Sequence, residues 1–128
     1  MIGGDGWDSP KLCEIGGPAL EGCFFTNHYA ADDTRPIIQD FVKKYKAKCS
    51  ADPDALACLA YDATYLVLNA VKTAGKTDGP AVRDALKATD MAVVSGQVKF
   101  DEERNPVKSA VVIEIKGGKF VYRSTVNP

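Results

Sequence analysis

Apolar residues recur every three or four positions through the middle of the chain, the spacing that places side chains on one face of a helix. In residues 31–49, Ile38, Phe41 and Tyr45 share such a face, and lysines occupy the opposite one. We therefore expect an amphipathic helix here, beginning near Thr34 and ending with positive charge at its C-terminus, where the helix dipole favours it.

A longer helix is expected next. Asp52 and Pro53 form a cap and a first-turn proline, and Gly75 marks the end. Between them apolar residues lie on most sides, so the pattern predicts the most buried helix of the protein.

Two shorter helices begin with the same combination of a capping residue and a proline. Ser9 and Pro10 predict a helix through about Glu14, and Asp78, or the glycine after it, precedes Pro80 at the start of the other.

Towards both ends of the chain the helical period gives way to short apolar or alternating runs, which indicate strands. The chain is therefore α/β, with three main helices flanked by strand pieces that do not make one complete sheet. The expected strands are Met1–Gly4, the segment CFFTNHY (23–29), Val98–Phe100, Ala110–Ile115 and Phe120–Tyr122, the last two joined by a hairpin at Gly117-Gly118.

Composition limits the function classes. The chain has 128 residues, 45% of them hydrophobic, and a net charge of −1, so it lacks the basic field of a nucleic-acid-binding protein. No apolar run reaches the roughly 20 residues of a membrane helix, and no signal peptide is visible. An exported chain that has lost its signal peptide would look the same.

Four cysteines, Cys13, Cys23, Cys49 and Cys58, leave two alternatives open. The local disulfides Cys13–Cys23 and Cys49–Cys58 are slightly favoured over four free thiols, because each pair is close in sequence. A zinc site that adds His28 is disfavoured, since its spacing matches no common ligand pattern. We expect no metal.

The chain offers little to an enzyme. His28 is its only histidine and lies in an expected strand among bulky neighbours, which favours a structural role. No phosphate-binding loop, dinucleotide fingerprint or nucleophile motif is present. We therefore expect neither catalysis nor a cofactor.

The opening loop is the most specialised segment. Gly4, Asp5, Gly6 and Trp7 combine a backbone that a ligand can approach closely, a carboxylate and a flat aromatic wall. A carboxylate held in this way can bind an ammonium group. The alternative is a tight turn in which Asp5 or Asp8 caps the backbone and the tryptophan belongs to the core.

Several segments occur in an order that resembles one known family: GGDGWDSPKL, GGPALEGCFFTNHYAADD, FVKKYKAKC, PDALACLAYDATYLVLNAV and GQVKFDEERNPVKSAVVIEIKGGKFVY. They resemble the C-terminal third of the extracytoplasmic substrate-binding proteins of branched-chain amino acid (Leu/Ile/Val-type) ABC transporters, which have the type I periplasmic-binding-protein fold. The resemblance covers essentially the whole chain. It implies two α/β lobes with the ligand between them, and a periplasmic or other extracytoplasmic location.

The resemblance also implies roles for particular residues. Asp5 matches the carboxylate that binds the amino group of the ligand, and Gly4 belongs to the same loop. Trp7 would shape the cleft, and Leu56 falls near a position that lines the side-chain pocket.

Three segments follow from the same resemblance. Residues 1–28 and 105–128 would belong to the second lobe and residues 29–104 to the first, with crossings near TNHYA and FDEERNP. The family's earlier part, which supplies most of the first lobe, has no counterpart here.

The implied partners are an amino-acid ligand and an ABC permease of the inner membrane, and we expect no nucleic acid. Alone, the chain should bind amino acids weakly or not at all, and could associate with a second copy or exchange strands through its truncated faces. The alternatives are a sensory ligand-binding domain of the same fold and a stand-alone interaction module. Which amino acid is bound stays open.

Overall fold

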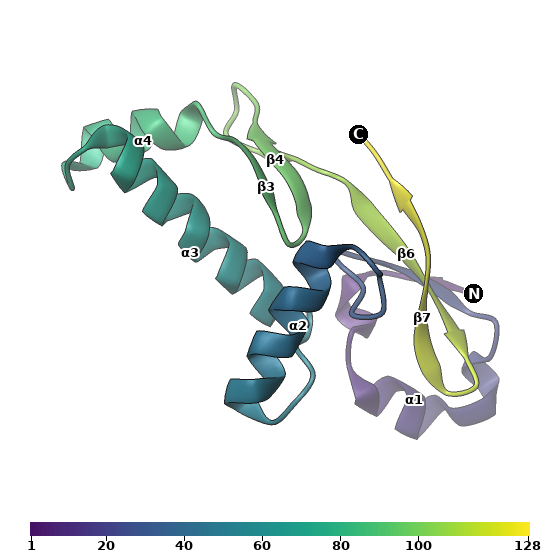
Figure 1. The fold of residues 1–128 in the computed structure, drawn as a ribbon. Helices are drawn as coiled ribbons and strands as arrows, with labels where there is room; N and C mark the ends of the chain where they lie inside the picture. The colour runs from purple at the N-terminus through teal and green to yellow at the C-terminus, as the bar shows by residue number, and fades with distance from the viewer.

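A computed structural model describes all residues, 1–128, and shows two separate sheets (Figure 1). The larger sheet has the order β1-β2-β6-β7, in which β1 runs parallel to β2 and the other neighbours are antiparallel. This confirms the strands expected at both ends of the chain. The strands are β1 (Ile2–Gly3), β2 (Phe24–Asn27), β6 (Ala110–Lys116) and β7 (Lys119–Val126).

The β6–β7 hairpin turns where the sequence indicated. Gly117 and Gly118 both have positive φ, 58° and 70°, which a two-residue hairpin turn of this hand requires and which glycine adopts without strain.

The smaller sheet is antiparallel and has the order β3-β4-β5, so the prediction of sheet pieces rather than one sheet is confirmed. Only its middle strand was expected from sequence. Its strands are β3 (Asp90–Val93), β4 (Gly96–Phe100) and β5 (Pro106–Val107).

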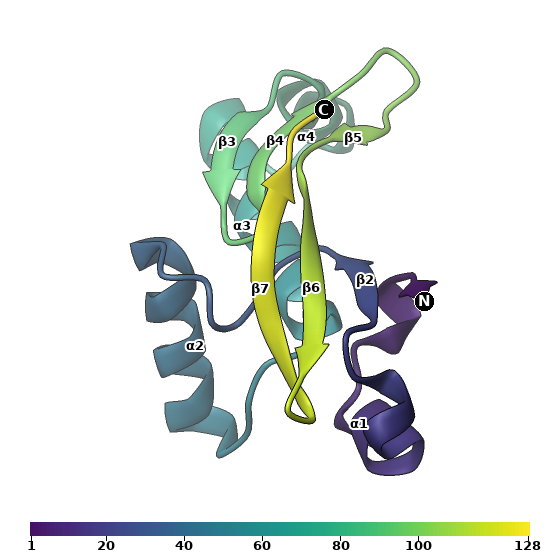
Figure 2. The same cartoon turned by 90° about the vertical axis from the view of Figure 1, so that its right-hand side faces the viewer.

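Four α-helices and two 3-10 turns complete the fold. In Figure 1 the long helix α3 leads away from the larger sheet, with α4 at its far end beside the β3–β4 hairpin. In Figure 2 α2 and α1 lie on opposite sides of the β6–β7 hairpin. The helical elements are η1 (Asp5–Trp7), α1 (Pro10–Gly16), η2 (Gly17–Leu20), α2 (Pro36–Cys49), α3 (Ala55–Ala74) and α4 (Gly79–Lys87).

Two predicted helix starts are wrong by a few residues. Helix α2 begins two residues after Thr34, and α3 is capped by Asp54, not Asp52, through a hydrogen bond of 2.8 Å from the Ala57 amide. Pro53 lies in the loop before α3 because it is buried there, with its carbonyl accepting a hydrogen bond from the Tyr29 hydroxyl.

Two apolar clusters form the core, one on the larger sheet and one between α2, α3 and the β3–β4 turn. They meet at the segment that leaves β2, where Tyr29 joins one cluster and Ala30 the other. The cluster of the larger sheet contains Cys23, Phe25, Ala30, Val111, Ile113 and Ile115. The second cluster joins α2, α3 and the β3–β4 turn through Tyr29, Ile38, Phe41, Val42, Cys58 and Val94.

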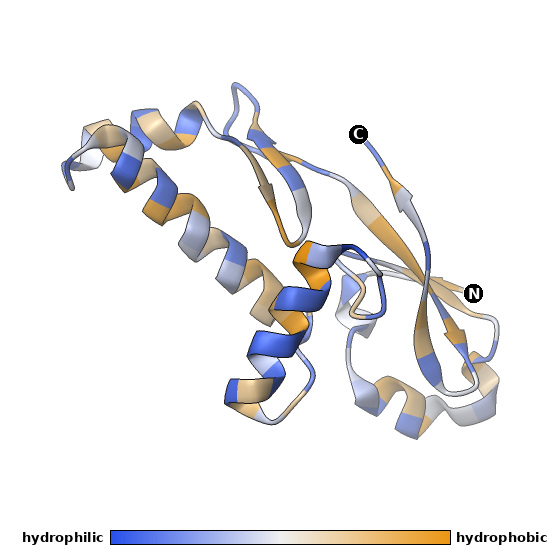
Figure 3. Ribbon diagram, viewed as in Figure 1, coloured by the Kyte–Doolittle hydropathy of each residue, from blue (hydrophilic) through white to orange (hydrophobic).

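The expectation that α3 is the most buried helix is confirmed, since four of its residues are buried, against three in α2 and none in α1 or α4. Cys58 packs with α2 and the β3–β4 turn, and α4 packs against the later part of the helix, whereas Leu68 is 59% exposed and Val67 47% exposed. Apolar and polar residues alternate along its outer side in Figure 3. The helix is apolar on most sides, but part of its apolar surface, including Leu68, is left without a packing partner in this chain.

The structure also contradicts the preference for disulfides, because all four cysteines are free thiols. Cys58 is fully buried in α3 and Cys49 is exposed at the end of α2, so the two belong to different environments. Burial, with the nearby negative charge of Asp62, raises the pKa of the Cys58 thiol to about 12. A protonated thiol of this kind is a packing group.

Candidate functional site

Parallel pairing of β1 with β2 brings the opening loop next to His28. In this pairing Gly3 lies opposite Phe25, so the residues that follow the two strands emerge at the same edge of the sheet. Asp5 and His28 meet there, with 3.2 Å between Asp5 Oδ2 and His28 Nε2. A carboxylate and an imidazole far apart in sequence therefore form a pair at the sheet edge.

The start of α3 forms the opposite wall of this site. Asp8 follows η1, and its Oδ2 accepts a hydrogen bond of 2.6 Å from the Ala55 amide, one of the amides at the helix N-terminus that lack a partner within the helix. This contact joins the opening loop to α3. It places Leu56 on the side of the helix that faces the loop.

The resulting pocket has a volume of about 260 Å³ and includes two of the four predicted site residues, Asp5 and Leu56. Both are open to solvent, since the Asp5 side chain is 66% exposed and Leu56 is 76% exposed. No lysine or arginine lines the pocket. Its residues are Asp5, Gly6, Asp8, His28, Asp54, Ala55, Leu56 and Leu59.

This set of side chains suits a small ligand that carries an ammonium group and an apolar part. Asp5 can accept charge-assisted hydrogen bonds from the ammonium, and the other two carboxylates add to the negative potential of the pocket. Leu56 and Leu59 offer apolar surface beside them.

The structure places the other two predicted residues, Trp7 and Gly4, outside the pocket lining. Trp7 packs on the core of the larger sheet, with its ring centroid 6.3 Å from that of Phe25. Gly4 has extended backbone with φ of −99°, and open space surrounds the position that a Cβ would take. The close approach in this loop is made at Gly3, whose Cβ would overlap the Trp7 indole.

Replacing Gly3 by alanine should displace the Trp7 indole and lower the free energy of unfolding by about 1–3 kcal/mol, because the added methyl overlaps a packed ring. Trp7 is the only tryptophan, so its fluorescence reports the displacement directly. The matched control is Gly4→Ala, which should change neither quantity appreciably. Equal effects of the two substitutions would contradict this account of the loop.

Sequence reasoning missed three polar residues of the pocket, His28, Asp8 and Asp54. His28 was interpreted as structural, yet its side chain is 34% exposed and reaches Asp5. Asp8 was considered only as a local cap, whereas its partner is the start of α3, 47 residues away. The expected strand included His28, whereas β2 ends at Asn27, so the sequence carried no signal for His28 or for Asp8.

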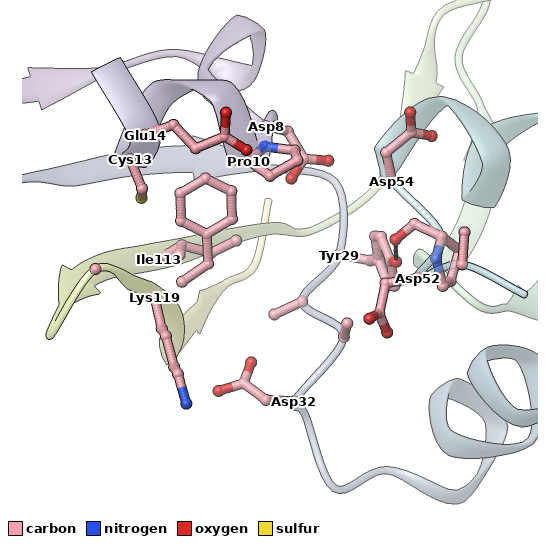
Figure 4. A pocket seen from close by; sticks show the side chains of 16 residues that line it. Asp8, Pro10, Cys13, Glu14, Tyr29, Asp32, Asp52, Asp54, Ile113 and Lys119 are labelled. Carbon is pink, nitrogen blue, oxygen red and sulfur yellow. Dashed lines mark hydrogen bonds between the residues drawn. The ribbon is translucent and has the colours of Figure 1, made fainter. Parts of the chain in front are cut away.

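A larger pocket of about 860 Å³ lies between α1, the segment after β2, the loop before α3 and the β6–β7 hairpin (Figure 4). Asp8 and Asp54 line both pockets, but Asp5 and Leu56 do not reach the larger one. In Figure 4 the side chains of Lys119 and Asp32 point toward one another. Of the opening-loop residues that line the smaller pocket, only Asp8 also lines the larger one.

The structure contains no group of three or more His, Cys, Asp or Glu side chains placed to hold a metal ion. None of its helices combines the length and the apolar character needed to cross a membrane.

Comparison with known families identifies the chain. The sequence profile of the family described as periplasmic binding protein matches residues 1–119, which is nearly the whole chain. The chain belongs to the periplasmic binding protein family. Proteins of this family bind solutes and are not enzymes, and the resemblance stated from the sequence is confirmed.

Among curated relatives, Leu/Ile/Val-binding protein homolog 2 of Brucella abortus (strain 2308) is 32% identical over 128 residues. The alignment covers 95% of this chain but 34% of that protein. The chain thus spans about a third of the length of the curated relatives that it matches.

Solved structures agree with this assignment and confirm the type I fold as a partial one. A leucine-binding protein from Thermotoga maritima is 37% identical, with a TM-score of 0.86 over 99% of this chain and 37% of that one. A branched-chain amino acid binding protein of Streptococcus pneumoniae, solved with isoleucine, is 30% identical, with a TM-score of 0.83 over 99% and 37%. A solute-binding protein of Rhodopseudomonas palustris in complex with benzoate is 31% identical, with a TM-score of 0.76 over 90% and 32%.

Proposed function

We propose that this chain forms part of an extracytoplasmic solute-binding component of an ABC importer for branched-chain or related amino acids. The observation that carries the proposal is the pocket that brings Asp5 and Leu56 together beside the start of α3. Asp5 would bind the ammonium of the ligand and Leu56 would contact its side chain. Gly4 and Trp7 would then act through the shape of the loop. An inner-membrane permease would be the protein partner.

The charge of the pocket supports an amine ligand over an aromatic acid. The relative solved with benzoate shows that ligands without an ammonium group occur among similar proteins. Asp5, Asp8 and Asp54 give the pocket of this chain three carboxylates and no lysine or arginine. A benzoate in direct contact with them would face like charge, whereas an ammonium gains from it.

We further propose that residues 1–28 and 105–128 belong to one lobe and residues 29–104 to the other. The two-sheet architecture supports this division except at β5, because β1, β2, β6 and β7 form one sheet and β3 and β4 belong to the other. The strand β5 lies just past the proposed boundary and pairs with β4, so the second crossing would follow it.

Exchanging Asp5 for asparagine tests the ligand proposal. With L-leucine as probe, we expect millimolar binding by the 128-residue chain, seen as shifts of the Gly4 and Gly6 amide signals in ¹H–¹⁵N spectra. Asp5→Asn should weaken it at least about tenfold, since a charge-assisted bond is lost. Asp84→Asn, the same charge change on exposed α4, should have no effect.

Controls on the ligand side sharpen the result. N-acetyl-leucine, which lacks the ammonium, should cause no shift of the loop signals. Leucine binding that is unchanged in Asp5→Asn would remove Asp5 as the anchor, and a complete absence of leucine binding would favour an interaction module. A sensory domain of the same fold would bind leucine as well but would not restore uptake in a strain lacking the transport receptor.

Self-association of the isolated chain is also proposed. Ile2 on edge strand β1 is 81% exposed, and the outer face of α3 presents Leu68 and Val67. Open strand edges and apolar helix faces favour contacts between copies. Light scattering should give a mass above that of the monomer, and a strictly monomeric folded species would contradict the proposal.

A further inference from the structure

His28 is the one titratable group of the pocket that the proposed function leaves without a role. Its Nε2 lies 3.2 Å from Asp5 Oδ2, and an ionised carboxylate can only accept, so Nε2 carries the hydrogen in this pair. The backbone of His28 is held separately, since its amide donates to the Asn27 side chain at 2.8 Å. The imidazole is therefore fixed at both its base and its tip.

In this pair the two carboxylate oxygens of Asp5 have different surroundings. Oδ2 accepts from His28, while Oδ1 accepts no hydrogen bond from the chain and lies in a carboxylate that is 66% exposed. The imidazole thus orients a side chain that would otherwise rotate freely at the end of a short loop, and leaves one oxygen for a ligand.

The other ionisable groups around the pair have partners of their own. Asp8 accepts from the Ala55 amide and Asp54 from the Ala57 amide, so both carboxylates are committed to the start of α3. Tyr29, the next residue after His28, donates its hydroxyl to the Pro53 carbonyl, and burial raises the pKa of that hydroxyl. No lysine or arginine lines the pocket. His28 is the only basic side chain that lines the pocket.

We propose that His28 is the positioning residue of the ammonium site and makes ligand affinity depend on pH. Neutral His28 orients Asp5 for the ligand. Protonated His28 places a positive charge beside the same carboxylate, where it competes with the ammonium of the ligand. Affinity should therefore fall as pH falls from about 8 to about 5.5. This inference rests on the proposed function, because it assumes that Asp5 binds an ammonium group.

The test measures leucine binding by the 128-residue chain at several pH values, through the Gly4 and Gly6 amide signals. Leucine itself keeps both charges across the range. We expect the apparent Kd of the wild type to rise about tenfold from pH 8 to pH 5.5, the effect of one charge-assisted contact. His28→Gln keeps an N–H donor and cannot take up a proton, so its Kd should match the wild type at pH 8 and change less than about twofold. His28→Leu should bind more weakly at every pH.

Each outcome decides a separate point. If His28→Gln shows the same pH dependence as the wild type, or His28→Leu binds as well as the wild type, the role of His28 is overturned while Asp5 as anchor stands. If the wild type gives no leucine response, or Asp5→Asn binds unchanged, the proposed function fails and this inference with it.

A second measurement needs no substitution at all. His28 is the only histidine, so its imidazole signals are assigned without ambiguity. Saturating leucine should move the midpoint of their pH titration to lower pH, because the ligand favours the neutral ring. A midpoint that leucine leaves unchanged would overturn the inference even if the glutamine variant did not fold.

Discussion

Phe25→Ala should lower the free energy of unfolding by about 3–5 kcal/mol, a large part of the stability of a domain of this size. Phe25 is fully buried in β2, at the centre of the larger sheet's core. Its ring packs edge-on against Phe120 at 4.9 Å between centroids and contacts the cluster that Trp7 joins. Alanine would leave a cavity between β2, β7 and η1, and these elements cannot all move inwards to fill it.

Urea unfolding followed by Trp7 fluorescence measures this loss. The matched control is Phe24→Ala, which removes the same side chain from the opposite face of the same strand, where Phe24 is only half-buried. We expect it to cost less than about 2 kcal/mol. If both variants lost the same stability, the larger sheet would not owe its stability to the face that carries Phe25.

Asp62→Ala should lower the free energy of unfolding by about 3 kcal/mol. Asp62 is 4% exposed, and its two carboxylate oxygens accept hydrogen bonds from the amides of Val94 and Ser95, at 2.9 and 2.8 Å. These amides form the turn between β3 and β4 and are buried. Alanine would leave two buried donors unpaired, and the cost of that exceeds the value of the bonds themselves.

Thermal or urea unfolding measures this loss of stability, and Asp40→Ala serves as the control. Asp40 lies on α2, is 59% exposed and pairs with Lys44 at 2.6 Å, so its loss should change stability by less than about 0.5 kcal/mol. The loss of stability for Asp62→Asn should fall between these two values. The side-chain oxygen of asparagine can accept from one of the two amides, but its NH2 group faces the other amide donor. A loss for Asp62→Ala as small as that for Asp40→Ala would show that other contacts hold the β3–β4 turn.

Local sequence signals predicted the elements whose formation depends on neighbours in the chain. Pro80 after Asp78 placed the start of α4, and Asp78 does accept from the Ala81 amide, at 3.2 Å. The two glycines at 117–118 placed the β6–β7 turn. Capping and turn formation are decided within a few residues, which is why a single sequence suffices for them.

The candidate site was predictable only in part, for a physical reason. The acidic glycine loop pointed to Asp5, because a carboxylate between two glycines can be recognised from neighbouring residues alone. The other members of the pocket come from elements that the sequence does not connect. Parallel pairing of β1 with β2 brings His28 to Asp5, and Asp8 brings Leu56 by accepting from Ala55.

The sequence by itself therefore determined the α/β character, the order of the elements and the family, because these follow from periodicity, turn residues and ordered motifs along the chain. Tertiary structure alone decided which face of α3 is buried, that the cysteines stay free, and that Trp7 belongs to the core while His28 faces the pocket. These properties depend on which surfaces meet across long separations in the chain. The sequence shows that a residue is apolar, but it does not show whether another part of the chain covers that residue.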